Sequence, residues 1–152
     1  MEIKMALSLP RDARTIAVAR HICRQTLREL GVEGECVSDI EVALTEACTN
    51  VLDHSGPGDE YDVEVTLAER DCVIRVVDGG SGFDVEAPRA PTDGAAERGR
   101  GIALMRALVD QVRFESRPAD GTIVHLEKKL AYVEGAPGPD LALSGSSPAD
   151  GG

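Results

Sequence analysis

The chain has 152 residues and a formal net charge of −11 at pH 7, with 27 acidic against 16 basic side chains. This length fits one domain, and the acidic balance disfavours nonspecific binding to nucleic acid or to an anionic membrane surface. No run of about 18 apolar residues is present, which excludes a membrane-spanning helix. The four cysteines form no Cys-x-x-Cys pair, so buried free thiols in a cytoplasmic protein are expected instead of a zinc or redox motif.

Hydrophobic spacing and turn residues predict strands and helices along most of the chain. Residues 2–9 alternate and predict a strand that Pro10 ends. Helices follow over 11–30 and 35–54, and the later elements are strands over 61–68 and 72–77, a helix over 101–110, and strands over 112–116 and 122–128. This order predicts an α+β two-layer sandwich, in which helices cover one face of a mixed, mostly antiparallel sheet.

The last 22 residues differ in composition from the rest of the chain. Of residues 131–152, 15 are Gly, Ala, Ser or Pro. Such a segment has too few apolar side chains to form a packed core. The sequence therefore predicts a folded domain over 1–130 and a disordered tail over 131–152.

The helix predicted over 35–54 carries a pair of polar side chains. Glu46 and Asn50 are four residues apart, so they share one face of the helix, and this face lies away from its apolar positions. A carboxylate beside a carboxamide oxygen suits a magnesium ion or the activation of a hydroxyl group. Taken alone, the pair is also what an ordinary solvated helix face contains.

A glycine-rich segment, Asp78-Gly79-Gly80-Ser81-Gly82, directly follows the buried strand predicted over 72–77. Asp78 would stand at the end of that strand, where its carboxylate can accept a hydrogen bond from an exocyclic amine. Gly80 and Gly82 lack a Cβ atom, so their backbone can turn sharply and approach a flat ring or a phosphate group closely. An ordinary turn is the alternative for this motif in isolation.

Two shorter motifs follow in the second half of the chain. Arg98-Gly99-Arg100-Gly101 precedes the predicted helix over 101–110. Glycines at a helix N-terminus present free N–H donors to an anion, and the two arginines add positive charge, although a glycine hinge fits the same residues. Gly121-Thr122 enters the last strand, where the Thr122 hydroxyl can bond a ring nitrogen or a bridging water.

Taken in order, the four motifs resemble the GHKL ATPase superfamily, which has the Bergerat fold, and within it the anti-sigma-factor serine/threonine kinases of bacteria. Glu46-Ala-Cys-Thr-Asn50 followed by His54 resembles the N-box of that family. Residues 78–84, 98–105 and 121–122 resemble its first, second and third glycine boxes. The resemblance covers residues 1–130 and is specific as a set, because the order and the spacing both agree.

The resemblance implies a site for ATP and Mg²⁺. Asn50 would coordinate the metal through its amide oxygen, and Glu46 would act as the base toward the substrate hydroxyl. Asp78 would bind the adenine amine with support from Thr122. The other residues carried over to ATP binding are His54, Gly80, Gly82, Arg98, Gly99, Arg100, Gly101 and Ile102, and residues 85–98 would form a lid. Phosphoryl transfer requires mainly such positioning and charge neutralisation.

The resemblance also implies partner proteins. The substrate would be a Ser or Thr of a STAS-domain anti-sigma-factor antagonist, and the kinase would also hold a sigma factor and form a homodimer. Arg20 occupies the place of a partner-contacting arginine in related kinases, although a solvated helix charge fits this position equally well. Two other functions stay open: a non-catalytic, ATP-dependent interaction switch that uses the same pocket, and an α+β binding domain without a nucleotide.

Overall fold

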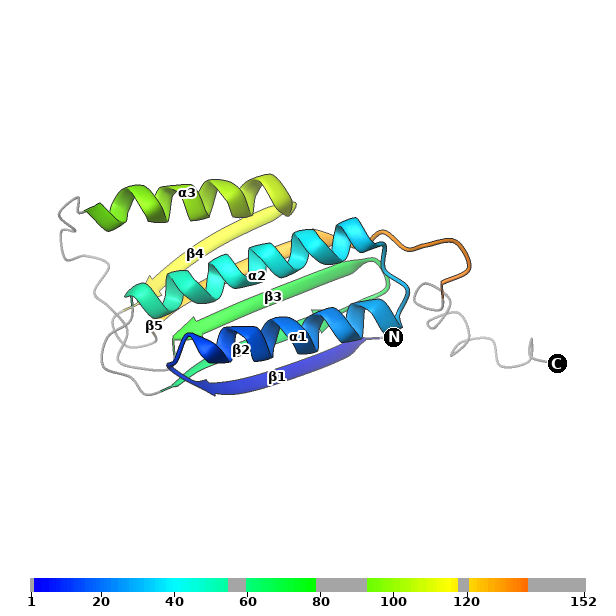
Figure 1. The fold of residues 1–152 in the computed structure, drawn as a ribbon, viewed down its shortest axis with the longest axis horizontal. Helices are drawn as coiled ribbons and strands as arrows, with labels where there is room; N and C mark the ends of the chain where they lie inside the picture. Colours follow the sequence, from blue (N-terminus) through cyan, green and yellow to red (C-terminus); the bar gives the residue numbers. More distant parts are fainter. Residues whose placement is uncertain (1, 55–59, 79–92, 118–120, 137–152) are drawn as a thin grey trace.

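The computed structural model describes residues 2–54, 60–78, 93–117 and 121–136 (Figure 1). Its strands are β1 (Ile3–Pro10), β2 (Glu60–Leu67), β3 (Asp71–Asp78), β4 (Gln111–Arg117) and β5 (Gly121–Lys129). Its helices are α1 (Arg14–Glu29), α2 (Gly34–His54) and α3 (Asp93–Leu108). Every predicted element is present in the described residues, and the start of α3 differs from its prediction by about two turns.

The strands form one sheet in the order β1-β2-β3-β5-β4, and every neighbouring pair is antiparallel. This confirms the predicted α+β class, although the described sheet is antiparallel throughout instead of mixed. After β3 the chain passes through α3 to the edge strand β4 and returns by a hairpin, which places β5 beside β3. In Figure 1, α1 and α2 lie across the same face of the sheet, and α3 lies beside α2 near β4.

The core lies between this face of the sheet and the central helix, α2. Alternate side chains of β3 point into the core, so Cys72, Ile74 and Val76 are at most 2% exposed. The same alternation brings the next inward position, Asp78, to 0%. Helix α2 contacts both other helices and the strands β3 and β5. No helix within the described ranges combines the length and the apolar character needed to cross a bilayer.

Helix α3 begins earlier than the sequence predicts. The prediction places its start at residue 101, whereas the structure begins it at Asp93. Residues 95–98 are Ala-Ala-Glu-Arg, which are strong helix formers and favour a helix here despite the roughly 1 kcal/mol that each glycine costs in a helix interior. Gly99 and Gly101 therefore lie inside the helix, and the prediction that they form its N-terminus is wrong.

The segment after β5 contacts the domain up to Ala136, beyond the predicted boundary at residue 130. Tyr132 forms an isolated β-bridge with Val32, and its hydroxyl donates to the carbonyl of Glu69 at 3.0 Å. The backbone N–H of Val133 donates to the carbonyl of Gly31 at 2.8 Å. The average composition of 131–152 hides these anchoring residues at its start. The rest of the predicted tail, 137–152, lies outside the described residues.

The cysteines are buried free thiols, as their sequence context predicts. All four are at most 5% exposed: Cys23, Cys36, Cys48 and Cys72. Burial raises the pKa of the Cys23 and Cys48 thiols to about 12, and it raises the pKa of Cys72 well above the ordinary thiol range. Because the thiolate is the reactive form of cysteine, these side chains are protected by their protonation as well as by their burial.

We expect all four thiols to react slowly with Ellman's reagent at about pH 8 in the folded protein, because their burial keeps the reagent away from the sulfur atoms. All four should react rapidly once guanidinium chloride has unfolded the chain. The absorbance of the released chromophore, followed over time, measures both rates, and the unfolded protein is the control. A thiol that reacts rapidly in the folded protein would contradict the described burial.

Candidate functional site

At one end of the sheet, buried polar side chains lie next to one another on neighbouring strands. In the sheet, Leu9 of β1 lies opposite Tyr61 of β2, and Tyr61 lies opposite Asp78 of β3. The register of β3 and β5, extended by one residue, places Thr122 on the other side of Asp78. Tyr61 and Asp78 are 0% exposed and Thr122 is 4% exposed. We call Tyr61, Asp78 and Thr122 the polar row.

The Asp78 carboxylate forms an ion pair that the motifs did not predict. Arg11 Nη1 lies 3.1 Å from Asp78 Oδ1, and Arg11 Nη2 donates to the carbonyl oxygen of Leu52 at 2.9 Å. Sequence reasoning assigned Arg11 to a helix and gave it no role. The strand order explains this contact. Because β1 and β3 are both antiparallel to β2, they run in the same direction, so the residue after Pro10 and the last residue of β3 lie at the same end of the sheet.

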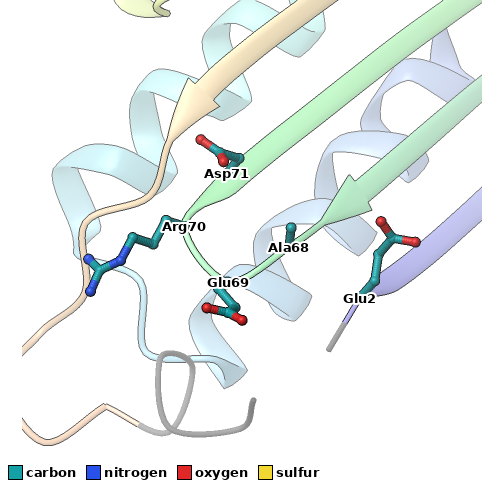
Figure 2. A pocket seen from close by; sticks show the side chains of 5 residues that line it. All are labelled: Glu2, Ala68, Glu69, Arg70 and Asp71. Atoms are coloured by element: carbon teal, nitrogen blue, oxygen red, sulfur yellow. The ribbon is translucent and has the colours of Figure 1, made fainter. Parts of the chain in front are cut away.

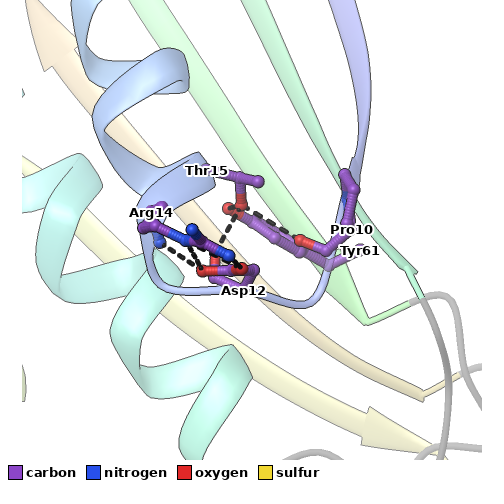
Figure 3. Close-up of polar contacts among 5 residues, drawn as sticks. All are labelled: Pro10, Asp12, Arg14, Thr15 and Tyr61. Carbon is purple, nitrogen blue, oxygen red and sulfur yellow. Dashed lines mark hydrogen bonds and ion pairs between the residues drawn. The ribbon is translucent and has the colours of Figure 1, made fainter.

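The turn that carries Arg11 is fixed by its own hydrogen bonds, which Figure 3 shows. The Thr15 hydroxyl lies 2.7 Å from the Tyr61 hydroxyl and 2.7 Å from the carbonyl oxygen of Asp12. Arg14 donates to both carboxylate oxygens of Asp12, and these hydrogen bonds lower the pKa of Asp12 to about 2. Burial raises the pKa of the Tyr61 phenol, and the bond with Thr15 opposes this shift. The turn is therefore tied to the polar row.

On α2, the two predicted polar residues are less exposed than a solvated helix face would be. Asn50 is only 8% exposed, and Glu46 is half-buried. A Cβ atom placed on Gly101 of α3 would lie 3.0 Å from Glu46 Oε1, so the absence of a side chain lets α3 approach this carboxylate. The structure thus brings Glu46 and Gly101 together from separate motifs.

Arg20 and Glu46 line the same shallow pocket between α1 and α2. The pocket has a volume of about 360 Å³, and its other lining residues are Arg24, Ser38, Glu41, Val42 and Thr45. The Glu41 carboxylate lies 4.0 Å from Arg20 Nε and 3.5 Å from Arg24 Nη1. Arg20 is therefore paired with Glu41 and lines the pocket that also contains Glu46.

Some predicted site residues are described only in part. Ile102 of α3 is half-buried against the core. His54 lies in α2, and Arg98, Gly99 and Arg100 lie in α3, but only their backbone belongs to the described structure. Gly80, Gly82 and the predicted lid up to residue 92 lie outside the described residues.

A larger hollow, of about 680 Å³, lies at the opposite end of the sheet (Figure 2). It surrounds the turn between β2 and β3, and its lining residues are Glu2, Ala68, Glu69, Arg70 and Asp71. Because β3 runs from Asp71 to Asp78, the full length of this strand separates the hollow from the polar row. No predicted site residue lines it, so it is not the candidate site.

The polar row and α2 together present hydrogen-bonding atoms and possible metal ligands toward one end of the domain. Asp78 offers a buried hydrogen-bond acceptor, and Thr122 Oγ1 has no hydrogen-bond partner among the described residues. A buried polar atom without a partner is costly and points to a ligand or a water. Asn50 and Glu46 supply oxygen atoms of the kind that Mg²⁺ prefers. Among the described residues, no group of three acidic, His or Cys side chains forms a metal cage by itself.

Comparisons with known proteins found a matching family and similar relatives. The family model described as a histidine kinase-like ATPase domain matches residues 9–128. The serine-protein kinase RsbW of Halalkalibacterium halodurans is 31% identical over 138 residues, which cover 84% of this chain and 84% of the relative. The anti-sigma F factor of Pasteuria penetrans is 36% identical over 126 residues, which cover 76% and 79%. These matches confirm the resemblance predicted from the motifs.

A solved structure shares the fold. The crystal structure of the RsbU and RsbW domains of a Mycobacterium tuberculosis protein matches with a TM-score of 0.66 at 22% sequence identity. The match covers 86% of this chain and 34% of the other, so this chain spans about a third of that protein. At this identity the likeness shows the fold alone.

Thr122→Val tests whether the Thr122 hydroxyl is available to bind a ligand or instead stabilises the fold. We expect the free energy of unfolding of the protein without added ligand to stay level or rise by up to about 1 kcal/mol, because a buried hydroxyl without a partner is removed. Equilibrium unfolding in guanidinium chloride measures this change. The contrast is Thr15→Val, which removes a hydroxyl with three close oxygen neighbours and should cost about 1–3 kcal/mol. A comparable loss for both variants would contradict the assignment.

Proposed function

The chain belongs to the histidine kinase-like ATPase domain family, and from this premise we propose that it is an ATP-dependent serine/threonine protein kinase that also acts as an anti-sigma factor. The observation that carries the proposal is the burial of Asp78, Thr122 and Asn50, polar side chains from three elements that meet at one end of the domain. The names of two relatives, a serine-protein kinase and an anti-sigma F factor, support both halves of the proposal.

The nucleotide would extend from the polar row toward α2. When bound, ATP supplies the phosphoryl group and Mg²⁺ neutralises part of its charge. Asp78 accepts a hydrogen bond from the adenine amine, Thr122 supports the base, and Asn50 offers its amide oxygen to Mg²⁺. The remaining proposed contacts with ATP are His54, Gly80, Gly82, Arg98, Gly99, Arg100, Gly101 and Ile102.

Glu46 is the proposed catalytic base. Its carboxylate would accept the proton of the substrate Ser or Thr hydroxyl as the hydroxyl oxygen bonds to the terminal phosphorus atom of ATP, and the bond from that phosphorus to the bridging oxygen would break to release ADP. Gly101 has no side chain and so leaves room for this carboxylate beside α3. The pocket between α1 and α2 lets a substrate segment approach Glu46 from the side of Arg20.

The proposed partners follow from the same assignment. The phosphorylated protein is a STAS-domain anti-sigma-factor antagonist, the inhibited protein is a sigma factor, and the kinase acts in the cytoplasm as a homodimer. Arg20 is the proposed partner contact because it lines the pocket that contains Glu46. Nucleic acid and membrane are not proposed as partners, in keeping with the net charge of −11.

Two substitutions on α2 separate binding of ATP from phosphoryl transfer. We expect Asn50→Ala to weaken binding of Mg²⁺-ATP by about tenfold or more, because a metal contact is lost. Glu46→Gln should keep that affinity within about twofold and slow phosphoryl transfer by roughly 10²–10⁴, because the base is lost. Isothermal titration gives the affinity, and transfer of labelled phosphate to STAS-domain proteins from the same genome gives the rate.

Thr49→Ala is the matched control, because Thr49 is an exposed neighbour of Asn50 whose hydroxyl donates to the Thr45 carbonyl within α2. It should leave both measurements unchanged. If Glu46→Gln transfers phosphate at the normal rate, Glu46 is not the base. If the wild type binds ATP but phosphorylates none of the antagonists, the protein is the non-catalytic, ATP-dependent switch and not a kinase.

A further inference from the structure

We propose that Arg11 is a positioning residue that makes the base-binding end of the site selective for a 6-amino purine over a 6-oxo purine, by fixing the position of the Asp78 carboxylate. The inference rests on the proposed function, in which Asp78 contacts the nucleobase. It assigns a role to a residue outside all four motifs of the nucleotide site. It also predicts a change in selectivity, which a residue that only stabilises the fold would not produce.

The burial of the ion pair is the first support. The Asp78 side chain is 0% exposed and the Arg11 side chain is 14% exposed, with 3.1 Å between Nη1 and Oδ1. A carboxylate removed from water is stable in its charged form only when a cation or several donors compensate it. Arg11 supplies that cation from the turn between β1 and α1.

The second contact of Arg11 joins the two ends of the proposed site. Its Nη2 donates to the carbonyl oxygen of Leu52 at 2.9 Å. Leu52 lies in the last turn of α2, two residues after Asn50. One planar guanidinium therefore links the base-binding carboxylate to the helix that carries Asn50, and a fork of fixed geometry suits this role better than a point charge.

The carboxylate next to Arg11 in the sequence already has hydrogen-bond partners other than Arg11. Asp12 follows Arg11 directly, but it accepts hydrogen bonds from the backbone N–H and the side chain of Arg14. The Thr15 contacts with Tyr61 and with the Pro10 carbonyl hold the same turn against the polar row (Figure 3). The turn thus directs Arg11 to Asp78 and Arg14 to Asp12.

The Asp78 carboxylate can only accept hydrogen bonds, and this decides which base suits it. A carboxylate is an acceptor with about four lone-pair positions, so a bond from Arg11 to Oδ1 does not exhaust it. It can accept from the 6-amino group of adenine, whereas the 6-oxo group of hypoxanthine would place two acceptors against each other. If Arg11 is removed, the carboxylate loses the contact that fixes its position, so its hydrogen bond with the 6-amino group weakens while the binding of a 6-oxo base changes little.

The test compares the dissociation constants of Mg²⁺-ATP and Mg²⁺-ITP by isothermal titration, because the two nucleotides differ at position 6 of the base. We expect the wild type to prefer ATP, and Arg11→Ala to reduce the ATP-to-ITP preference by about tenfold or more. Arg11→Lys keeps the cation and should retain most of the preference. Arg75→Ala is the matched control, because it removes a partly exposed arginine of β3 whose partner is Glu64, and it should change neither constant by more than about twofold.

Arg11→Gln accompanies these variants, because loss of a buried ion-pair partner can unfold a protein and Gln keeps two amide donors without the charge. It should lower the preference as Arg11→Ala does, with thermal unfolding as the check of folding. An unchanged preference in the folded Arg11→Gln variant overturns the inference. So does tighter ATP binding with the preference kept, because Arg11 would then compete with the base. A wild type that binds neither nucleotide overturns the proposed function, and the inference with it.

Discussion

The buried carboxylate of Asp78 is the constraint around which the site is arranged. The alternation of β3 that buries Cys72, Ile74 and Val76 also buries this residue. A charge in that position must be compensated, and Arg11 provides the compensation while its second nitrogen holds the end of α2. The same requirement therefore joins β1, β3 and α2 at one end of the sheet.

The contacts of Arg11 therefore hold two sets of functional groups in a fixed position relative to each other. The polar row offers hydrogen-bonding atoms for a flat base, and the face of α2 with Asn50 and Glu46 offers oxygen atoms for a metal and a proton. Helix α3 closes the other side of that face, where Gly101 leaves space for the Glu46 carboxylate. In the proposed function, base recognition and phosphoryl transfer would thus depend on elements that share one core.

Much of the fold was predictable because each strand alternates and each of the first two helices has a clear end. The face of α2 with Glu46 and Asn50 and the strand-end position of Asp78 followed from spacing alone. The role of Arg11 did not, because it depends on which strand ends meet in space. The start of α3 was also missed, because helix-forming residues before Gly99 extend the helix through a motif that suggests a break. Tyr132 anchors a segment whose average composition indicates disorder.

The central claim is that a nucleotide lies with its base at Asp78 and its phosphates toward Asn50. A crystal structure of the protein with Mg²⁺ and a non-hydrolysable ATP analogue tests it most directly. The account predicts the adenine amine within hydrogen-bonding distance of the Asp78 carboxylate, the Arg11 ion pair retained, and the metal bound to the Asn50 amide oxygen. An analogue bound elsewhere, or a base that makes no contact with Asp78, would contradict it.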